Sequence, residues 1–276
     1  MHLQWFPGHM TRAMRMMEEQ VKLVDGIVYV LDSRAPYASI NNKLLGLFGN
    51  KPVLYVLNKS DLVNYSELNL VIKDFEKNGK AVVSAVGTSD KSAKAIYDSI
   101  FNLLAPTLEK YKNKGIKRPL RVMVVGIPNT GKSTIINLIC GGKKAKTGDK
   151  AGVTKDKQWV KIKDLEFLDT PGTMPPSFDN QTNAEYLAFI GSINDDILDF
   201  AELSLSLINY LVKNLPSSLT DIYKVDVENK ESLQILEDIA KKRGAIKKGG
   251  EIDYERVAST LIIDLRKGKL GKILFK

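Results

Sequence analysis

Cysteine and histidine are nearly absent from this chain of 276 residues, which has one cysteine, Cys140, and two histidines, His2 and His9. A single cysteine cannot form an internal disulfide, and it excludes a zinc site built on several thiolates. No apolar run approaches the roughly 20 residues that a membrane-spanning helix needs. The first residues also lack the apolar core of a signal peptide. These absences predict a soluble, cytoplasmic protein with no membrane partner.

Acidic residues are scarce in one part of the chain. Residues 1–177 contain 27 Lys/Arg and 16 Asp/Glu, whereas residues 178–276 contain 14 and 16. The excess is greatest in residues 110–163, which hold 15 basic and two acidic side chains. Scattered lysines usually form a solvated face. A window with so large an excess of basic side chains instead favours a polyanionic partner that is larger than a nucleotide. RNA is the leading choice.

The segment Gly126–Ser133 (GIPNTGKS) matches the pattern GxxxxGK[ST] and follows an apolar run. In such a loop, backbone N–H groups surround phosphates at the start of a helix. Lys132 is expected to reach the β- and γ-phosphates as a catalytic charge, and Ser133 to ligate Mg²⁺. The expected phosphate-binding residues are Asn129, Thr130, Gly131, Lys132, Ser133 and Thr134.

A second motif, Asn58–Asp61 (NKSD), follows the apolar run 53–57 and predicts that the base is guanine. A carboxylate at Asp61 can accept hydrogen bonds from N1–H and the amine of guanine, whereas adenine would leave it unpaired. NKSD alone could be a polar turn, but beside a phosphate loop the guanine interpretation is favoured. The expected base-binding residues are Asn58, Lys59, Ser60, Asp61, Ser84, Ala85 and Val86.

The third motif is Asp169–Gly172 (DTPG), again after an apolar run. Asp169 is expected to hold Mg²⁺ through water, and the Gly172 N–H to meet the γ-phosphate. Thr154 lies between this motif and the phosphate loop, where a switch threonine would close over the metal as a ligand and catalytic residue. An ordinary surface threonine is the alternative.

The order of the motifs is unusual, because NKSD and the segment 84–87 precede the phosphate loop. A circular permutation can build the same sheet if a new join connects the old ends. We predict an α/β GTP-binding domain over residues 1–176, with a mostly parallel sheet, helices on both faces and one antiparallel edge at Lys163–Asp164. The join is expected at 106–119. Residues 177–276 are expected to form a smaller all-α, RNA-binding domain, because Leu, Ile and Ala recur across 183–212 without the breaks that separate strands. The cations at 266–269 fit either an rRNA contact or a helix end.

Several stretches carry a resemblance to a known family: Trp5–Met10, Leu31–Pro36 (LDSRAP), NKSD, GIPNTGKST, residues 146–159 and DTPG. The chain resembles the circularly permuted GTPases, and within them the ribosome biogenesis GTPase A family of bacterial large-subunit assembly factors. The resemblance covers essentially the whole chain. It implies a monomeric GTP phosphohydrolase that binds GTP and GDP, with slow intrinsic turnover. It further implies binding to precursor large (50S) subunits through rRNA and ribosomal proteins, and release on particle-stimulated hydrolysis late in assembly.

The resemblance also suggests how hydrolysis is assisted. Many GTPases have a glutamine just after DxxG, but Thr173 stands there and is too short to replace it. His9 is the substitute that the family suggests, and packing is the alternative. Asn129 matches an asparagine that helps other GTPases bind K⁺, although it could instead only stabilise the loop. Two other functions stay open: an RNA-binding assembly scaffold with GTP as a structural ligand, and a permuted GTPase of the small subunit.

Overall fold

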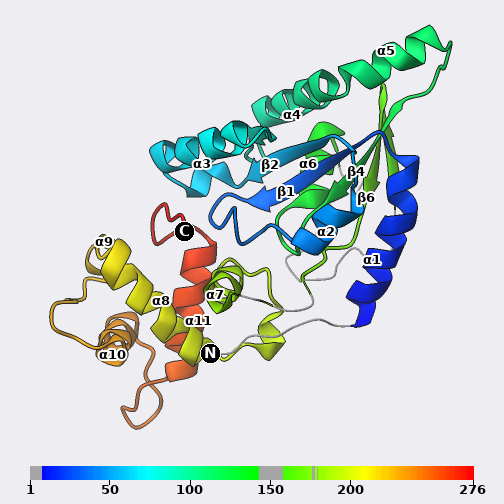
Figure 1. Ribbon diagram of the computed structural model, residues 1–276. Helices are drawn as coiled ribbons and strands as arrows, with labels where there is room; N and C mark the ends of the chain where they lie inside the picture. The colour runs from blue at the N-terminus through cyan, green and yellow to red at the C-terminus, as the bar shows by residue number, and fades with distance from the viewer. Residues whose placement is uncertain (1–7, 143–157, 176–177, 179) are drawn as a thin grey trace. The chain divides into compact units, whose positions relative to one another are not determined.

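The computed structural model describes residues 8–142, 158–175, 178 and 180–276. They form two compact units (Figure 1). The first, called the sheet unit, extends to residue 179 and also contains Leu274–Lys276. The second, called the helical unit, contains Asn180–Ile273.

The sheet unit is built on six strands in the order β3-β2-β1-β4-β6-β5. All neighbours are parallel except β5 and β6, which pair antiparallel. Strand β1 is buried along its whole length, as expected for a parallel strand covered on both faces. The predicted parallel sheet with one antiparallel edge is therefore confirmed. The strands are β1 (Gly26–Asp32), β2 (Val53–Asn58), β3 (Ala81–Ser84), β4 (Leu120–Val125), β5 (Gln158–Ile162) and β6 (Leu165–Asp169).

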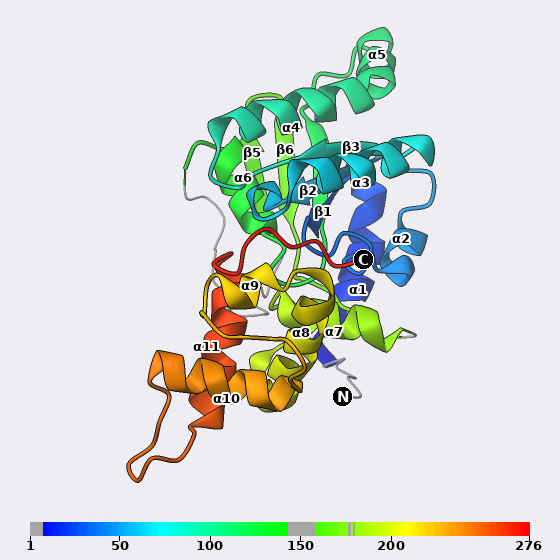
Figure 2. The same cartoon turned by 90° about the vertical axis from the view of Figure 1, so that its left-hand side faces the viewer.

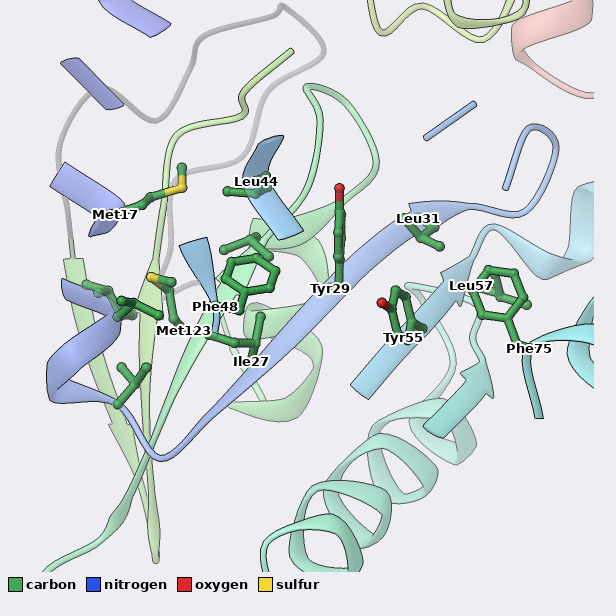
Figure 3. Close-up of a cluster of buried hydrophobic side chains, with 14 of the residues drawn as sticks. Met17, Ile27, Tyr29, Leu31, Leu44, Phe48, Tyr55, Leu57, Phe75 and Met123 are labelled. Carbon is green, nitrogen blue, oxygen red and sulfur yellow. The ribbon is translucent and has the colours of Figure 1, made fainter. Parts of the chain in front are cut away.

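Helices cover both faces of this sheet. One face packs against α1 (Gly8–Gln20), α2 (Asn42–Leu47) and α3 (Tyr65–Lys77) through the side chains drawn in Figure 3, including Met17, Tyr29 and Phe75. The other face packs against α4 (Asp90–Leu103), α5 (Ala105–Asn113) and α6 (Lys132–Ile139). Met17 of α1 lies in this core, with Met14 and Met16 packed against it. The elements at the nucleotide edge include the 3₁₀ helix η2 (Ser60–Leu62).

The segment predicted as a polar join, 106–119, is half helical. Pro106 lies in the first turn of α5, where its missing N–H has no partner to lose. Leu108 and Tyr111 pack against the core on the α4 side. The join is thus a short amphipathic helix followed by the loop 114–119.

The helical unit contains five α-helices within the part of the chain described. The region 183–212 is helical but divided, because Gly191 has φ +80° and Asn194 and Asp199 each accept backbone N–H groups as caps. None of the helices in the described ranges has the length and apolar composition needed to cross a bilayer. The helices are α7 (Gln181–Phe189), α8 (Phe200–Asn214), α9 (Ser217–Thr220), α10 (Ser232–Arg243) and α11 (Tyr254–Arg266).

Two of the cations at 266–269 have internal partners. Arg266 pairs with Asp195 at 2.9 Å and donates to the carbonyls of Ala188 and Phe189. Lys269 pairs with the buried Asp264 at 2.9 Å. The helix-end interpretation is therefore favoured for both, because Arg266 holds the end of α11 against α7 and Asp195, and Lys269 pairs within the end of α11 itself.

The last three residues return to the sheet unit. Leu274 and Phe275 are buried, and Leu274 belongs to the α1–α3 cluster. The Phe275 N–H donates to the Arg34 carbonyl at 2.7 Å, and Lys276 pairs with Glu67 at 3.1 Å. The helical unit is thus enclosed in sequence by segments of the sheet unit.

Candidate guanine nucleotide site

The phosphate loop connects β4 to α6 at the carboxyl edge of the parallel strands, where ligands of such sheets bind. Gly126 has φ +150°, and a Cβ there would collide with the Val30 carbonyl oxygen. Inside the loop, Thr130 Oγ1 and Lys132 Nζ donate to the Ile127 carbonyl at 3.1 and 2.9 Å. Burial lowers the pKa of Lys132 to about 8. The loop is therefore preformed, with a buried lysine at its centre.

The NKSD motif contacts this loop although 72 residues separate them. Asn58 ends β2, and its Nδ2 donates to the Thr130 carbonyl at 2.8 Å. Lys59 has φ +58° and donates from Nζ to the Asn129 carbonyl at 2.8 Å. Asp61 is exposed in η2, so its carboxylate is accessible to a base. The two halves of the expected pocket thus meet through Asn58 and Lys59.

The segment 84–87 completes this side of the site. The Ser60 N–H donates to the Ala85 carbonyl at 3.0 Å, and Ser92 Oγ accepts the Val86 N–H at 2.9 Å. A Cβ built on Gly87 would lie 3.1 Å from Cγ2 of Thr134. All three nucleotide segments therefore converge at one place.

Sequence reasoning missed two residues that hold the guanine side together. Asp32 ends β1 and is 1% exposed; its Oδ2 contacts Arg34 at 2.7 Å and Lys59 Nζ at 2.8 Å. Burial alone would raise the pKa of Asp32, but the Arg34 guanidinium and the Lys59 ammonium outweigh it and hold the pKa well below its ordinary value. We call Asp32, Arg34 and Lys59 the Asp32 cluster. The sequence feature that could have pointed to Asp32 is its position at the carboxyl end of a buried parallel strand, where ligand-binding residues of such sheets lie.

The metal side of the site joins the phosphate loop to DTPG. Ser133 Oγ donates to Asp169 Oδ2 at 2.8 Å, and Thr170 Oγ1 donates to the Val124 carbonyl at 2.7 Å. Burial raises the pKa of Asp169, opposed by the Ser133 hydrogen bond and by Lys132. A Cβ on Gly172 would lie 2.7 Å from the Pro128 nitrogen, so only glycine permits this approach.

Two of the expected catalytic side chains lie outside the described residues. Thr154 lies outside the described residues. His9 is in the first turn of α1, and its side chain is also outside the described part. Its neighbour Met10 is 1% exposed, and its Sδ accepts the Met174 N–H at 3.4 Å. The start of α1 therefore touches the segment that follows Gly172.

A phosphate loop, a guanine motif and DTPG at the carboxyl edge of one parallel sheet, with the guanine motif first in sequence, define a circularly permuted P-loop GTPase. Comparisons with known proteins agree. A family profile described as "50S ribosome-binding GTPase" matches residues 121–243. The GDP-bound structure of TM YlqF has a TM-score of 0.67 at 25% identity, covering 95% of this chain and 98% of that chain.

Curated relatives identify the family. A Bacillus licheniformis protein named ribosome biogenesis GTPase A is 37% identical over 278 residues, covering 100% of this chain and 98% of the relative. A Bacillus cereus protein of the same name is 36% identical, covering 100% of this chain and 94% of the relative. The chain belongs to the ribosome biogenesis GTPase A family, and it is a GTPase.

Proposed function

We propose that this GTPase binds precursor large (50S) ribosomal subunits as a monomer in the bacterial cytoplasm. In this proposal it promotes a late assembly step, and the particle stimulates the hydrolysis that releases it. The observation that carries the proposal is the joining of the guanine and phosphate halves through Asn58 and Lys59, in a chain related along its whole length to named assembly GTPases. Contacts with rRNA and ribosomal proteins follow from the same proposal.

The phosphates would lie on the backbone of the loop 126–131, with Lys132 against the β- and γ-phosphates. Mg²⁺ fits the oxygen donors present: Ser133 Oγ faces Asp169, whose Oδ1 is buried and has no hydrogen-bond partner among the described residues. When bound, Mg²⁺ supplies positive charge to the transferred phosphoryl group. Asp169 would act through water, and Thr154 would add a further ligand as its loop closes.

Asn129 is proposed as a K⁺ ligand beside the phosphates. Its φ of +60° and the engagement of its carbonyl by Lys59 fix the backbone at this point. A monovalent cation here would add positive charge at the transition state without an arginine finger. Turnover that is equal in KCl and NaCl would reject this role.

His9 is proposed to orient the attacking water or to accept a proton from it. Two observations support it: the start of α1 touches Met174, and Thr173 is fully buried with no hydrogen-bond partner for Oγ1 among the described residues. Thr173 is therefore poorly placed to act on water. His9→Ala should lower turnover on the particle while GTP affinity stays unchanged.

The central experiment compares GTP turnover alone, with large-subunit precursors and with small subunits. Stimulation by large-subunit precursors supports the proposal. Binding without stimulated turnover would instead favour the scaffold with GTP as a structural ligand. Stimulation by small subunits alone would favour the small-subunit alternative.

A further inference from the structure

The amino edge of the sheet, opposite the nucleotide, gathers lysines from segments far apart in sequence. In a parallel sheet the strands start at the same edge. Here the passage from α1 to β1, the loop from α5 to β4 and the β5–β6 turn lie together, and Figure 1 shows the first two meeting. Direct contacts confirm the neighbourhood, because Leu120 N–H donates to the Asp164 carbonyl at 2.9 Å and Asp25 N–H to the Arg121 carbonyl at 2.7 Å.

Six lysines of this edge are exposed and form no ion pair with any residue in the described ranges. We call them the basic edge. They are Lys22, Lys110, Lys112, Lys114, Lys117 and Lys163.

Nearby acids do not neutralise the basic edge. Asp25 is already paired with Arg118 at 2.8 Å, and Glu166 with Arg121 at 2.8 Å. The exposed acids in these segments and in the last turn of α1 are Glu18, Glu19, Glu109 and Asp164, which are fewer than the six lysines. The outer helices differ: α3 carries two lysines and three acids, and α4 carries two of each. The imbalance at this edge is therefore absent from these two outer helices of the same unit.

The segment from α5 to β4, which carries four of the six lysines, is held in place. The Tyr111 hydroxyl bonds to Asp25, and the Arg118 guanidinium lies 4.7 Å from the centre of the Tyr111 ring. The Ile116 N–H also donates to the Tyr111 carbonyl at 2.9 Å. Because the backbone is fixed, less conformational entropy is lost when a ligand binds.

We propose that the basic edge is a contact for the RNA phosphate backbone, separate from the nucleotide site. Lysine ammonium groups act as point charges for phosphates, and releasing counterions from RNA supplies the binding free energy. Because ammonium groups contact phosphates and not base edges here, the binding should depend on charge and show little base preference. The inference rests on the proposed function, since the particle supplies the RNA, and it assigns one surface to that contact.

The test uses two full-length triple variants with the same change in charge. Lys112→Glu/Lys114→Glu/Lys117→Glu alters the basic edge, and Lys43→Glu/Lys73→Glu/Lys94→Glu is the control on α2, α3 and α4. Affinity for purified rRNA and for large-subunit precursors is measured with a GTP analogue over a salt series. The edge variant should bind both at least about tenfold more weakly than the control, with a salt slope about two to three units shallower. Unstimulated turnover should not change.

Each other outcome overturns a specific statement. If the two variants bind rRNA with equal affinity, the proposed RNA contact at the basic edge is wrong. If both variants still bind the particle in that case, the proposed function is not contradicted. Weakened particle binding with unchanged rRNA binding assigns the edge to a protein partner and rejects RNA. Failure of the wild-type chain to bind any particle contradicts the proposed function itself.

Discussion

Removing the charge of Asp32 should weaken guanine nucleotide binding, although this residue touches the site only through Lys59. The ammonium lies 2.8 Å from the Asp32 carboxylate and 2.8 Å from the Asn129 carbonyl, so the carboxylate holds Lys59 against the phosphate loop. A hydrogen bond to a charged group contributes about 1.5–3 kcal/mol. If Asp32→Asn releases Lys59, the Kd for GDP should rise about 10- to 150-fold.

The single variant also leaves the Arg34 guanidinium, 2% exposed, without its counter-charge. Breaking a buried pair in this way costs about 3–5 kcal/mol of folding free energy. The informative variant is therefore Asp32→Asn/Arg34→Met, which removes the buried charge pair and should recover stability. If Asp32 acts through Lys59, the double variant keeps the affinity loss of the single one.

Calorimetric titration with GDP, together with thermal unfolding, separates the two effects. Adding Lys59→Met to the double variant should weaken GDP binding little further, because the shared interaction is already lost. A double variant that binds GDP within about twofold of the wild-type chain would refute this reasoning.

Three further predictions concern the same site. Asp61→Asn should lower affinity for GTP by about a hundredfold and favour xanthine nucleotides, because the carboxylate acceptor is lost; competition binding checks this, and an unchanged guanine preference contradicts it. Gly172→Ala should reduce turnover at least about tenfold, since its Cβ would lie 2.7 Å from the Pro128 nitrogen, while GDP affinity changes little; single-turnover kinetics measures it, and normal rates reject it. The pKa of Asp32 is depressed in the folded state, so its stabilisation is present above about pH 4 and is lost as the pH falls. Acid unfolding of Asp32→Asn/Arg34→Met should therefore depend less on pH between about 2 and 4 than that of the wild-type chain, and parallel curves would contradict this.

The sequence predicted what local patterns encode. The apolar runs before the three motifs became strands β2, β4 and β6, and the motifs at their ends converge because parallel strands share one carboxyl edge. The Asp32 cluster could not be derived this way, because the partners of Asp32 depend on how β1 and β2 pair side by side. Leu274 and Phe275 were equally out of reach, since nothing local distinguishes an apolar segment that packs on the sheet from one that ends a helix.

The return of the chain at Leu274 means that the helical unit is attached at both of its ends. One attachment follows DTPG directly in sequence, and at the other the Phe275 N–H meets the Arg34 carbonyl beside the carboxylate that holds Lys59. Both covalent crossings between the units therefore lie in segments that border the nucleotide site, the outgoing one after the metal motif and the returning one beside the base motif.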